Sequence, residues 1–453
     1  MNDTICAIST SQGIGAISIV RVSGEEAISI VNSIFKGKDL TKVESHTINY
    51  GHIVDNDEVI DEVLVSVMKA PRTFTVEDIV EINTHGGIAP TNKVLEVLLN
   101  KGCRLAEPGE FTKRAFLNGR IDLLEAEAVM DMIDAKTETQ RKMAANQIDG
   151  KTSKLINELR DDMVQIISNI NVNIDYPEYD DVDIITNDVL VPKITKLKDR
   201  IKHILKESEN GKIIKDGIKT SIIGRPNVGK SSLLNALLQE DKAIVTNIAG
   251  TTRDIVEGQI SINGILLNMI DTAGIRETED IIESIGVEKS LKIMDEADLI
   301  LFMLNNNEEL TKDTKKLLDK IKDRKYLILI NKIDLDPKLD RKELKVDPNR
   351  IIELSVTEDK GIDVLKSKIE ELFNLNEIET KDPTYLSNTR SISILKRCLK
   401  SVEDIEESLK NNMPIDMIEL DIKNIWEELG TINGSTYEEE LLDEMFSRFC
   451  LGK

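Results

Sequence analysis

Residues 224–232 read GRPNVGKSS, and their types and spacing are those of a loop that binds phosphate groups. In such a segment the glycines allow backbone N–H groups to surround a diphosphate. The helix that follows the loop adds the positive end of its dipole. The Lys230 side chain can then reach the β- and γ-phosphates, and the Ser231 hydroxyl can bind Mg²⁺. The segment therefore predicts a nucleotide site.

Three further motifs follow this loop in the order of a GTP switch: GTTRD at 250–254, DTAG at 271–274 and NKID at 331–334. The aspartate of DTAG can hold Mg²⁺ through water, and its glycine N–H can meet the γ-phosphate. Thr252 can complete the metal shell only while that phosphate is present, which makes an order–disorder switch. The Asp334 carboxylate can accept two N–H bonds from guanine, a pair that adenine does not offer. The four motifs together predict GTP.

Ser355, in the sequence LSVT, occupies the place of the last base-contacting loop, although Val356 and Thr357 depart from the usual Ser-Ala-Lys. Ser231 and Thr252 are the predicted Mg²⁺ ligands. The residues predicted to bind GTP are Asn227, Val228, Gly229, Lys230, Ser231, Ser232, Thr246, Asn247, Ile248, Ala249, Gly250, Thr251, Thr252, Asp271, Thr272, Ala273, Gly274, Asn331, Lys332, Asp334 and Ser355.

The group that orients the attacking water is not fixed by the motifs. Ile275 follows DTAG, where small Ras-like switches keep a glutamine for this purpose. Spacing does not choose among four acidic candidates, which are Glu277, Glu279, Asp280 and Glu283. A cation is also needed to offset developing charge. It is either a monovalent ion held by Asn227 and backbone carbonyls of residues 246–251, or Arg253.

The elements that must position these residues follow from hydrophobic periodicity. Apolar residues 220–223 predict a strand before the loop, and the leucine-rich pattern after it predicts a helix, so that residues 219–375 form a nucleotide-binding block. Residues 4–117 alternate short β-branched runs with helical spacing. There the predicted strands are 16–22, 47–54, 59–68 and 79–83, and the predicted helices are 25–35 and 92–100.

Long helical patterns flank the nucleotide-binding block, at 123–134, 137–148, 155–174 and 188–206 before it and at 391–410, 416–429 and 437–448 after it. We expect the two sets to pack together as one discontinuous helical domain, with two separate helical domains as the alternative. The acidic residues 175–181 predict a solvated connector. The fold class is multidomain α/β plus α: an N-terminal α+β domain at 1–118, the helical domain at 119–215 and 376–453, and an inserted Ras-like P-loop GTPase domain at 216–375.

Composition limits the classes of function. The 453 residues suggest about three domains of ~150 residues each. The absence of a run of ~18 apolar residues predicts a soluble, cytoplasmic protein. The four cysteines show no C-x-x-C spacing, which argues against a zinc site or a disulfide framework. A net charge of −23 repels RNA, so any nucleic acid would be bound through a local patch or a partner, unless the charge serves only solubility.

Four further segments carry a resemblance to a known family: VRVSG at 20–24, Glu81 followed by HGG at 85–87, GEFTKRAFLNGR at 109–120, and the final C-x-G-K. With these and the GTP motifs, the chain resembles the MnmE/TrmE family of tRNA modification GTPases over essentially its whole length. Two segments depart from the family pattern. Residues 10–15 replace a Pro- and Gly-rich turn, and Asn83 replaces a common histidine.

The resemblance implies a homodimer through N-terminal domains that are similar to folate-binding aminomethyltransferases. It implies a site for formyl- or methylene-tetrahydrofolate, lined at the matching positions by Arg21, Glu81, Arg120 and Lys453. It also implies an FAD- and NADH-dependent partner of the MnmG/GidA type in a heterotetramer. Together they would add a carboxymethylaminomethyl-type group at C5 of the wobble uridine (U34) of certain tRNAs, the partner supplying the basic surface.

For catalysis the resemblance implies a K⁺ ion in place of an arginine finger, with two GTPase domains meeting across it. The matching K⁺ positions are Asn227, Thr246, Ile248 and Thr251, and the water-orienting glutamate falls on Glu283, while Lys230 is the phosphate-binding lysine. Cys450 is either a reactive thiol near the folate or a small residue in a packed tail. Two other functions stay open: a ribosome-assembly switch, which would need a basic RNA-binding domain, and a folate-dependent transferase acting alone.

Overall fold

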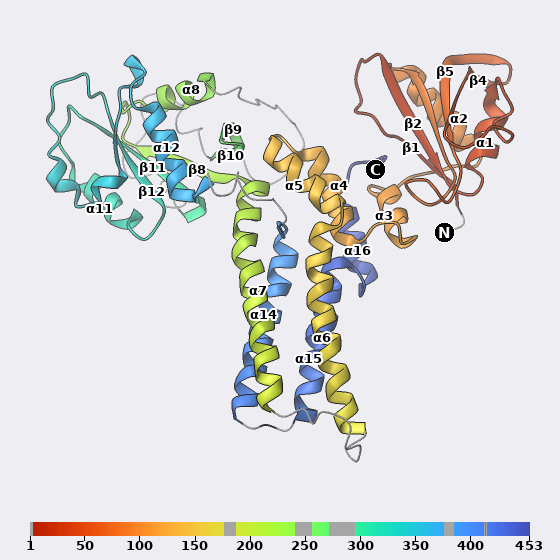
Figure 1. Cartoon of the computed structure of the whole chain (residues 1–453). Coiled ribbons are helices and arrows are strands. Elements are labelled where there is room, and N and C mark those ends of the chain that lie inside the picture. Colours follow the sequence, from red (N-terminus) through yellow and green to blue (C-terminus); the bar gives the residue numbers. More distant parts are fainter. Residues whose placement is uncertain are drawn as a thin grey trace. The chain divides into compact units, whose positions relative to one another are not determined.

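The computed structural model describes residues 3–175, 187–240, 256–270, 295–375, 385–411, 413 and 415–453 (Figure 1). The described chain forms two compact units. The first contains Met1–Met130, Gln147–Thr195 and Lys400–Lys453, and the second contains Asp131–Asn146 and Lys196–Leu399. No helix among the described residues is both long and apolar enough to cross a membrane.

A seven-stranded sheet forms the N-terminal part of the first unit, in the order β3-β4-β5-β6-β2-β1-β7. Strands β1 and β7 are parallel, and the other neighbours run antiparallel. One face packs on helices α1 and α2, because alternate residues such as Val63, Val65 and Val67 point into the core. The strands are β1 (Ile5–Ile8), β2 (Ile17–Ser23), β3 (Phe35–Lys36), β4 (Thr47–Asp55), β5 (Glu58–Met68), β6 (Ile79–His85) and β7 (Arg104–Leu105), and the helices are α1 (Ala27–Ile34) and α2 (Ile88–Asn100).

The strands predicted for residues 4–117 are confirmed as β2, β4, β5 and β6, and the helices as α1 and α2. Strands β1, β3 and β7 and helix α3 (Glu110–Leu117) were not predicted. Helix α3 escapes a periodicity argument because it buries charges as well as apolar groups: Arg114 is 1% exposed and Glu110 3%. The two form an ion pair of 2.9 Å, and Arg114 also pairs with Asp3 and Glu77 of the sheet domain. A buried charge is tolerated only with such partners.

Long helices from both sides of the nucleotide-binding block contact one another within the first unit. The Arg160 guanidinium lies 4.3 Å from the centroid of the Trp426 ring and donates to Ser435 Oγ at 2.8 Å. Asn433 Nδ2 donates to Asn157 Oδ1 at 2.8 Å. Helices of the two predicted sets thus pack on each other in the first unit, whereas residues 131–146, 196–216 and 389–399 of these helices belong to the second unit. The helices of these sets are α4 (Leu123–Asp134), α5 (Glu138–Ile148), α6 (Lys151–Asp175), α7 (Asn187–Asp216), α14 (Thr389–Lys410), α15 (Ile415–Asn433) and α16 (Glu439–Phe446).

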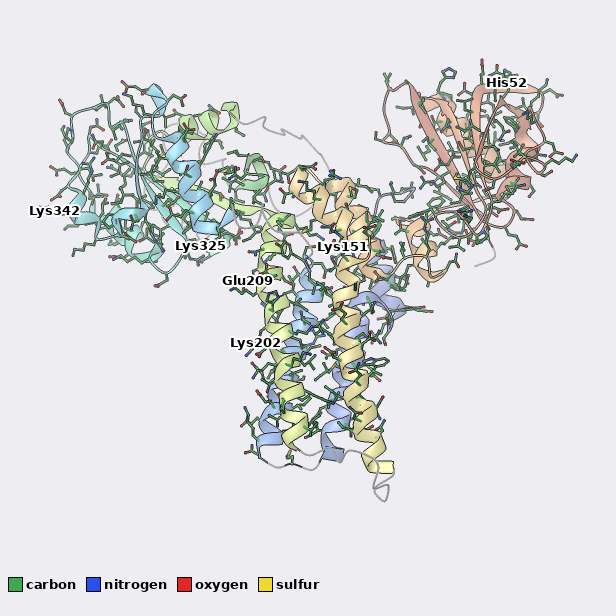
Figure 2. The ribbon with its side chains drawn as sticks, in the orientation of Figure 1. His52, Lys151, Lys202, Glu209, Lys325 and Lys342 are labelled. Carbon is green, nitrogen blue, oxygen red and sulfur yellow. The ribbon has the colours of Figure 1, made fainter. Side chains whose placement is uncertain are left out.

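Helix α7 continues to Asp216, beyond the predicted end at residue 206. The sequence ESENG at 207–211 has the composition of a breaker. A Cβ on Gly211 would lie 2.7 Å from the carbonyl oxygen of Leu386, so the glycine permits a close approach of two segments. That packing outweighs the low helix propensity of glycine. Exposed residues such as Lys202 and Glu209 lie along this helix (Figure 2).

The second unit contains a six-stranded sheet in the order β13-β12-β11-β8-β10-β9, parallel apart from the antiparallel pair β10 and β9. Successive residues of β8 and β11 face opposite cores. Ile222 packs with α8 and α12, and Ile223 packs with α11. The elements are β8 (Ile218–Gly224), α8 (Lys230–Glu240), β9 (Val256–Ile262), β10 (Ile265–Ile270), β11 (Leu299–Asn305), α11 (Lys312–Ile321), β12 (Tyr326–Asn331), β13 (Ile351–Glu353) and α12 (Ile362–Phe373).

Candidate functional site

The predicted phosphate loop lies between the end of β8 at Gly224 and the start of α8 at Lys230. Asn227 and Gly229 have φ values of 62° and 100°, in the left-handed region. A Cβ on Gly229 would overlap Asn331 Nδ2, so a side chain there would push the loop away from β12. The Val228 side chain is buried in the core beneath the loop. These features hold the loop open as a cradle.

Lys230 and Ser231 stand in the first turn of α8, where the helix N-terminus favours an anion. The Lys230 ammonium group donates to the carbonyl oxygen of Gly224 at 2.6 Å. Burial lowers the pKa of Lys230, since a charged amine is less stable away from water. A bound phosphate would offset this loss of hydration, so the lysine fits its predicted role.

The NKID segment contacts the phosphate loop directly. Asn331 Nδ2 donates to the Val228 carbonyl oxygen at 2.8 Å, and Lys332 Nζ donates to the Asn227 carbonyl oxygen at 2.8 Å. Asp334 follows on the same loop, and its carboxylate is exposed. Residues that sequence analysis assigned to base recognition therefore also support the loop assigned to phosphate.

Ser355 lies beside Asp334, although the two belong to different loops. Its hydroxyl donates to Asp334 Oδ1 at 2.6 Å, and it lies 3.1 Å from the Thr357 hydroxyl. The hydrogen bond from Ser355 lowers the pKa of Asp334, because it favours the charged carboxylate. The site thus keeps the acceptor that guanine N–H groups require in its ionised form.

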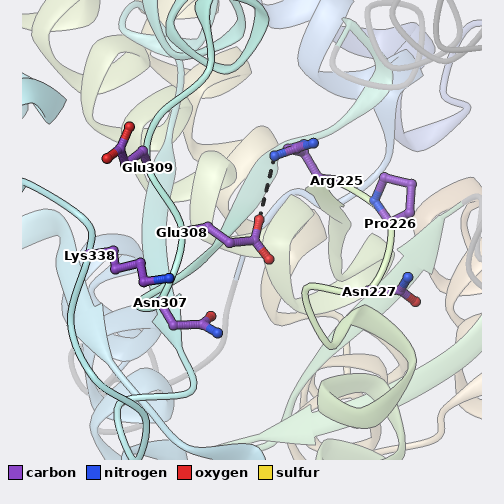
Figure 3. A pocket seen from close by; sticks show the side chains of 7 residues that line it. All are labelled: Arg225, Pro226, Asn227, Asn307, Glu308, Glu309 and Lys338. Atoms are coloured by element: carbon purple, nitrogen blue, oxygen red, sulfur yellow. Dashed lines mark hydrogen bonds and ion pairs between the residues drawn. The ribbon is translucent and has the colours of Figure 1, made fainter.

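A cavity of about 710 Å³ opens beside the phosphate loop (Figure 3). The Arg225 guanidinium and the Glu308 carboxylate form an ion pair of 3.5 Å across it. The lining residues that follow β11 were not predicted from the sequence. They come directly after an apolar parallel strand, and ligands bind at the edge of an α/β sheet where such strands end. The lining residues are Arg225, Pro226, Asn227, Asn307, Glu308, Glu309 and Lys338.

Several predicted site residues lie outside the described residues. They are Thr246, Asn247, Ile248, Ala249, Gly250, Thr251, Thr252, Asp271, Thr272, Ala273, Gly274 and Glu283, with the open candidates Arg253, Ile275, Glu277, Glu279 and Asp280. Among the described residues no cluster of three or more His, Cys, Asp or Glu could hold a metal ion. The donors there are the Ser231 hydroxyl, which suits Mg²⁺, and the Asn227 side-chain carbonyl, which suits a monovalent cation.

A second cluster lies in the first unit, where three of the four predicted folate-site residues meet. Arg21 and Glu81 are paired across β2 and β6, with Nε to Oε1 at 2.9 Å. Arg21 also donates to the carbonyl oxygen of Gly452 at 3.2 Å, beside Lys453. Burial, and then the nearby Arg21 charge, lower the pKa of Lys453.

The Arg120 side chain lies over an aromatic ring in the same sheet domain. Its guanidinium lies 5.4 Å from the centroid of Phe74 and donates to the Thr73 carbonyl oxygen. Phe74 packs against the apolar cluster that contains Phe111, and the Arg21 guanidinium lies 5.6 Å from the centroid of the Phe111 ring. The cationic groups are therefore arranged around one apolar patch.

The C-terminal tail is bound to the N-terminal sheet domain. Phe111 N–H donates to the Lys453 carbonyl oxygen at 3.1 Å, and Ser9 Oγ donates to that of Gly452 at 3.1 Å. Gly452 has φ of 87°, and a Cβ there would overlap the Ile8 carbonyl oxygen. Cys450 is an exposed free thiol in this tail, so it is accessible to a ligand or an oxidant.

Comparison with known proteins identifies the family. The family models "MnmE helical domain" and "GTP-binding protein TrmE N-terminus" match residues 123–450 and 4–120. The "tRNA modification GTPase MnmE" of Bacillus cytotoxicus is 54% identical over 455 residues, which cover 100% of this chain and 99% of the relative. The protein of the same name from Bacillus anthracis is likewise 54% identical over 455 residues, with the same two coverages. The chain belongs to the MnmE family.

The chain is therefore a GTP hydrolase that uses GTP and Mg²⁺. The geometry of the phosphate loop agrees with this family. The predicted fold class is confirmed: an N-terminal TrmE-type domain, a helical domain and a P-loop GTPase domain. A solved structure, the G domain of the T. maritima FeoB iron transporter, is 28% identical, with a TM-score of 0.25, and the match covers 34% of this chain and 98% of that one. The family assignment depends on the full-length relatives.

We predict that Asp334→Asn exchanges the base preference of this MnmE-family site. Two charge-assisted hydrogen bonds to guanine are lost, each of about 1.5–3 kcal/mol, so GDP affinity falls at least about 100-fold. The new amide N–H can instead donate to the 2-carbonyl group of xanthine. Calorimetric titration with GDP and XDP measures both effects. Asp336→Asn is the matched control, since Asp336 is exposed and lies two positions away. Unchanged GDP affinity in Asp334→Asn would contradict the assignment.

Proposed function

We propose that this chain is a tRNA modification GTPase whose hydrolysis cycle drives a folate-dependent reaction. With an FAD- and NADH-dependent partner of the MnmG type it adds a carboxymethylaminomethyl-type group at C5 of the wobble uridine of certain tRNAs. One observation carries the proposal: the same chain contains a GTP cradle and, in its N-terminal sheet domain, the cluster of Arg21, Glu81 and Lys453. The name of the full-length relatives supports it.

The hydrolysis step needs positive charge beside the phosphates and an oriented water. Lys230 supplies one fixed charge from the end of the phosphate loop. We assign a K⁺ ion to Asn227, Thr246, Ile248 and Thr251, Mg²⁺ to Ser231 and Thr252, and the orientation of water to Glu283. Asn227 supports this assignment, because its side chain borders the cavity beside the loop. Two GTPase domains pairing across the K⁺ ion would complete the site.

The folate site has the charges that a tetrahydrofolate derivative requires. The cations Arg21, Arg120 and Lys453 suit the carboxylates of the ligand, and the Glu81 carboxylate can accept N–H groups of its pterin ring. The partly exposed Phe74 ring offers an apolar surface beside Arg120. Cys450 is exposed in the adjoining tail. We propose that it serves either as a reactive thiol near the folate or as a small packing residue.

Exposed apolar residues and the net charge of the chain support the proposed partners, a second copy of the chain and a tRNA-binding subunit. The sheet face opposite α1 and α2 exposes Ile48, Tyr50 and Leu64, which suits pairing of two N-terminal domains in a homodimer. The net charge of −23 suits a chain that leaves most tRNA contact to its partner subunit. We propose domain limits of 1–118, 119–215 with 376–453, and 216–375, and a cytoplasmic location for the protein.

The modification is tested by mass spectrometry of wobble uridines in tRNA from cells that lack this protein. We expect the mass of the carboxymethylaminomethyl-type group to be absent from those uridines. The wild-type chain should restore it, and a Lys230→Ala chain, which lacks the phosphate-binding lysine, should not. Wobble uridines of unaltered mass in the deletion strain would contradict the proposed function.

Monovalent ion dependence tests the K⁺ assignment. We expect kcat for GTP to be about tenfold higher in K⁺ than in Na⁺, which corresponds to about 1.4 kcal/mol of transition-state stabilisation. Asn227→Ala should remove this difference, because it removes one ligand of the ion. Asn349→Ala, an exposed amide on another loop, is the control and should keep it. Equal rates of the wild-type chain in the two salts would remove K⁺ from the mechanism.

The role of Glu283 is tested by Glu283→Ala. We expect GTP affinity to stay within about twofold and kcat to fall about 100-fold, the lower end of what a positioned general base contributes. Single-turnover hydrolysis and equilibrium binding separate the two effects. Glu277→Ala is the matched control and should keep normal turnover. Unchanged turnover in Glu283→Ala would reject the assignment.

Folate binding is tested at the tail. Gly452→Ala would displace the tail from β1 and separate Lys453 from Arg21, so affinity for 5-formyltetrahydrofolate should fall about tenfold, or about 1.4 kcal/mol. Gly102→Ala is the control, because Gly102 also has positive φ but meets no atom within 4 Å. GTP affinity should be unchanged in both variants. Folate affinity at the wild-type level in Gly452→Ala would argue against a site at the tail.

A further inference from the structure

Residues 131–146, the end of α4 and most of α5, belong to the second unit although their sequence pattern places them with the helical set. Met143 is 1% exposed and packs in the same core as Ile218 of β8, Leu267 of β10 and Leu233 of α8. A helical segment that precedes the GTPase domain by many residues thus contributes to the core of that domain.

Polar contacts join this segment to the hairpin of β9 and β10. Lys136 Nζ donates to Gln259 Oε1 of β9 at 2.8 Å. Gln259 Nε2 in turn donates to Asn268 Oδ1 of β10 at 2.9 Å, and Asn268 Nδ2 donates to the Asp216 carbonyl oxygen at 2.6 Å. The chain of hydrogen bonds therefore crosses both strands of the hairpin.

The turn of the hairpin is in contact with α5, which belongs to the same segment. A Cβ on Gly264 would overlap the Thr139 hydroxyl oxygen, so α5 lies directly on the turn. Gln140, which is 8% exposed, donates from Nε2 to the Lys215 carbonyl oxygen at 3.0 Å. Lys215 also forms an ion pair of 2.7 Å with Asp131. Residues 131–146 thus contact the turn and one strand of the hairpin and the end of α7.

The hairpin is placed to respond to the nucleotide. Strand β9 begins at Val256, two positions after the last residue of the GTTRD motif, and β10 ends at Ile270, directly before the DTAG motif. Its pairing register shifts between Met269 and Ile270, at the end nearest DTAG. A hydrogen-bonded pair of strands moves as a unit, so a displacement at either motif is carried to Gln259 and Gly264.

We propose that residues 131–146 read the nucleotide state of the GTPase domain through this hairpin, with Lys136 and Thr139 as positioning residues that act through Gln259 and Gly264. The inference rests on the assignment of the GTP motifs. The contact has different strength in the GDP and GTP states. Linkage then requires that weakening the contact changes the affinity for the two nucleotides by different factors. A contact that only supports the fold would change both affinities equally.

The experiment measures the ratio of the Kd for GDP to the Kd for a non-hydrolysable GTP analogue in the full chain. Lys136→Met removes the donor but keeps most of the side-chain length, and we expect the ratio to change about fivefold, the lower end of coupling between sites. Lys136→Arg keeps a donor and should stay near the wild-type ratio. Lys142→Met is the control, because Lys142 is an exposed lysine of α5 in the same segment 131–146.

A second variant, at another residue of the contact, separates the effect of the contact from misfolding of a single variant. Thr139→Ala removes the hydroxyl group at the hairpin turn but leaves Lys136 and Met143 in place, and it should change the ratio in the same direction. A ratio that stays at the wild-type value in both Lys136→Met and Thr139→Ala would overturn the inference. Failure of the wild-type chain to bind either nucleotide would instead contradict the assignment of the GTP motifs.

Discussion

The phosphate loop can bind an anion only if its backbone N–H groups are directed inward, so its conformation has to be held by other groups. The side chains of Asn331 and Lys332 do this by donating to the carbonyl oxygens of Val228 and Asn227. The buried Val228 side chain fixes the loop from below. The NKID loop, which contains the predicted base-recognising residue Asp334, therefore also holds the conformation of the predicted phosphate loop. Loss of either asparagine or lysine would weaken the binding of any nucleoside phosphate, whatever its base.

A buried ionic network has the corresponding role in the N-terminal sheet domain. Arg114 is held by Asp3, Glu77 and Glu110, and Glu110 also pairs with Arg104 of β7. Removing one partner would leave an uncompensated buried charge, which costs far more than a surface ion pair contributes. The network fixes α3 on the sheet. Because Phe111 of that helix binds the Lys453 carbonyl oxygen, the position of the last residue of the chain depends on charges buried more than three hundred positions earlier.

Local patterns predicted most of the helices and strands. Alternation of buried and exposed residues is sufficient for β2, β4, β5 and β6, and the GTP motifs are short continuous segments. Contacts between distant segments were not predictable in the same way. Periodicity shows that α5 has an apolar side, but not that Met143 packs in the core of the GTPase domain. The cavity residues Asn307 and Lys338 come from loops that only the sheet brings together.

The contact between Arg21 and Glu81 also depends on how distant segments are aligned. The two residues are 60 positions apart, and only the register of β2 against β6 makes them direct neighbours. Slipping that register by one residue would turn one of the two side chains into the core, where a lone charge is unstable. The ion pair therefore depends on this one register. The same reasoning applies to Gln259 and Asn268 in the β9–β10 hairpin, whose hydrogen bond exists in only one register. In both units, polar pairs across strands set the alignment on which the distant partners, Gly452 and Lys136, depend.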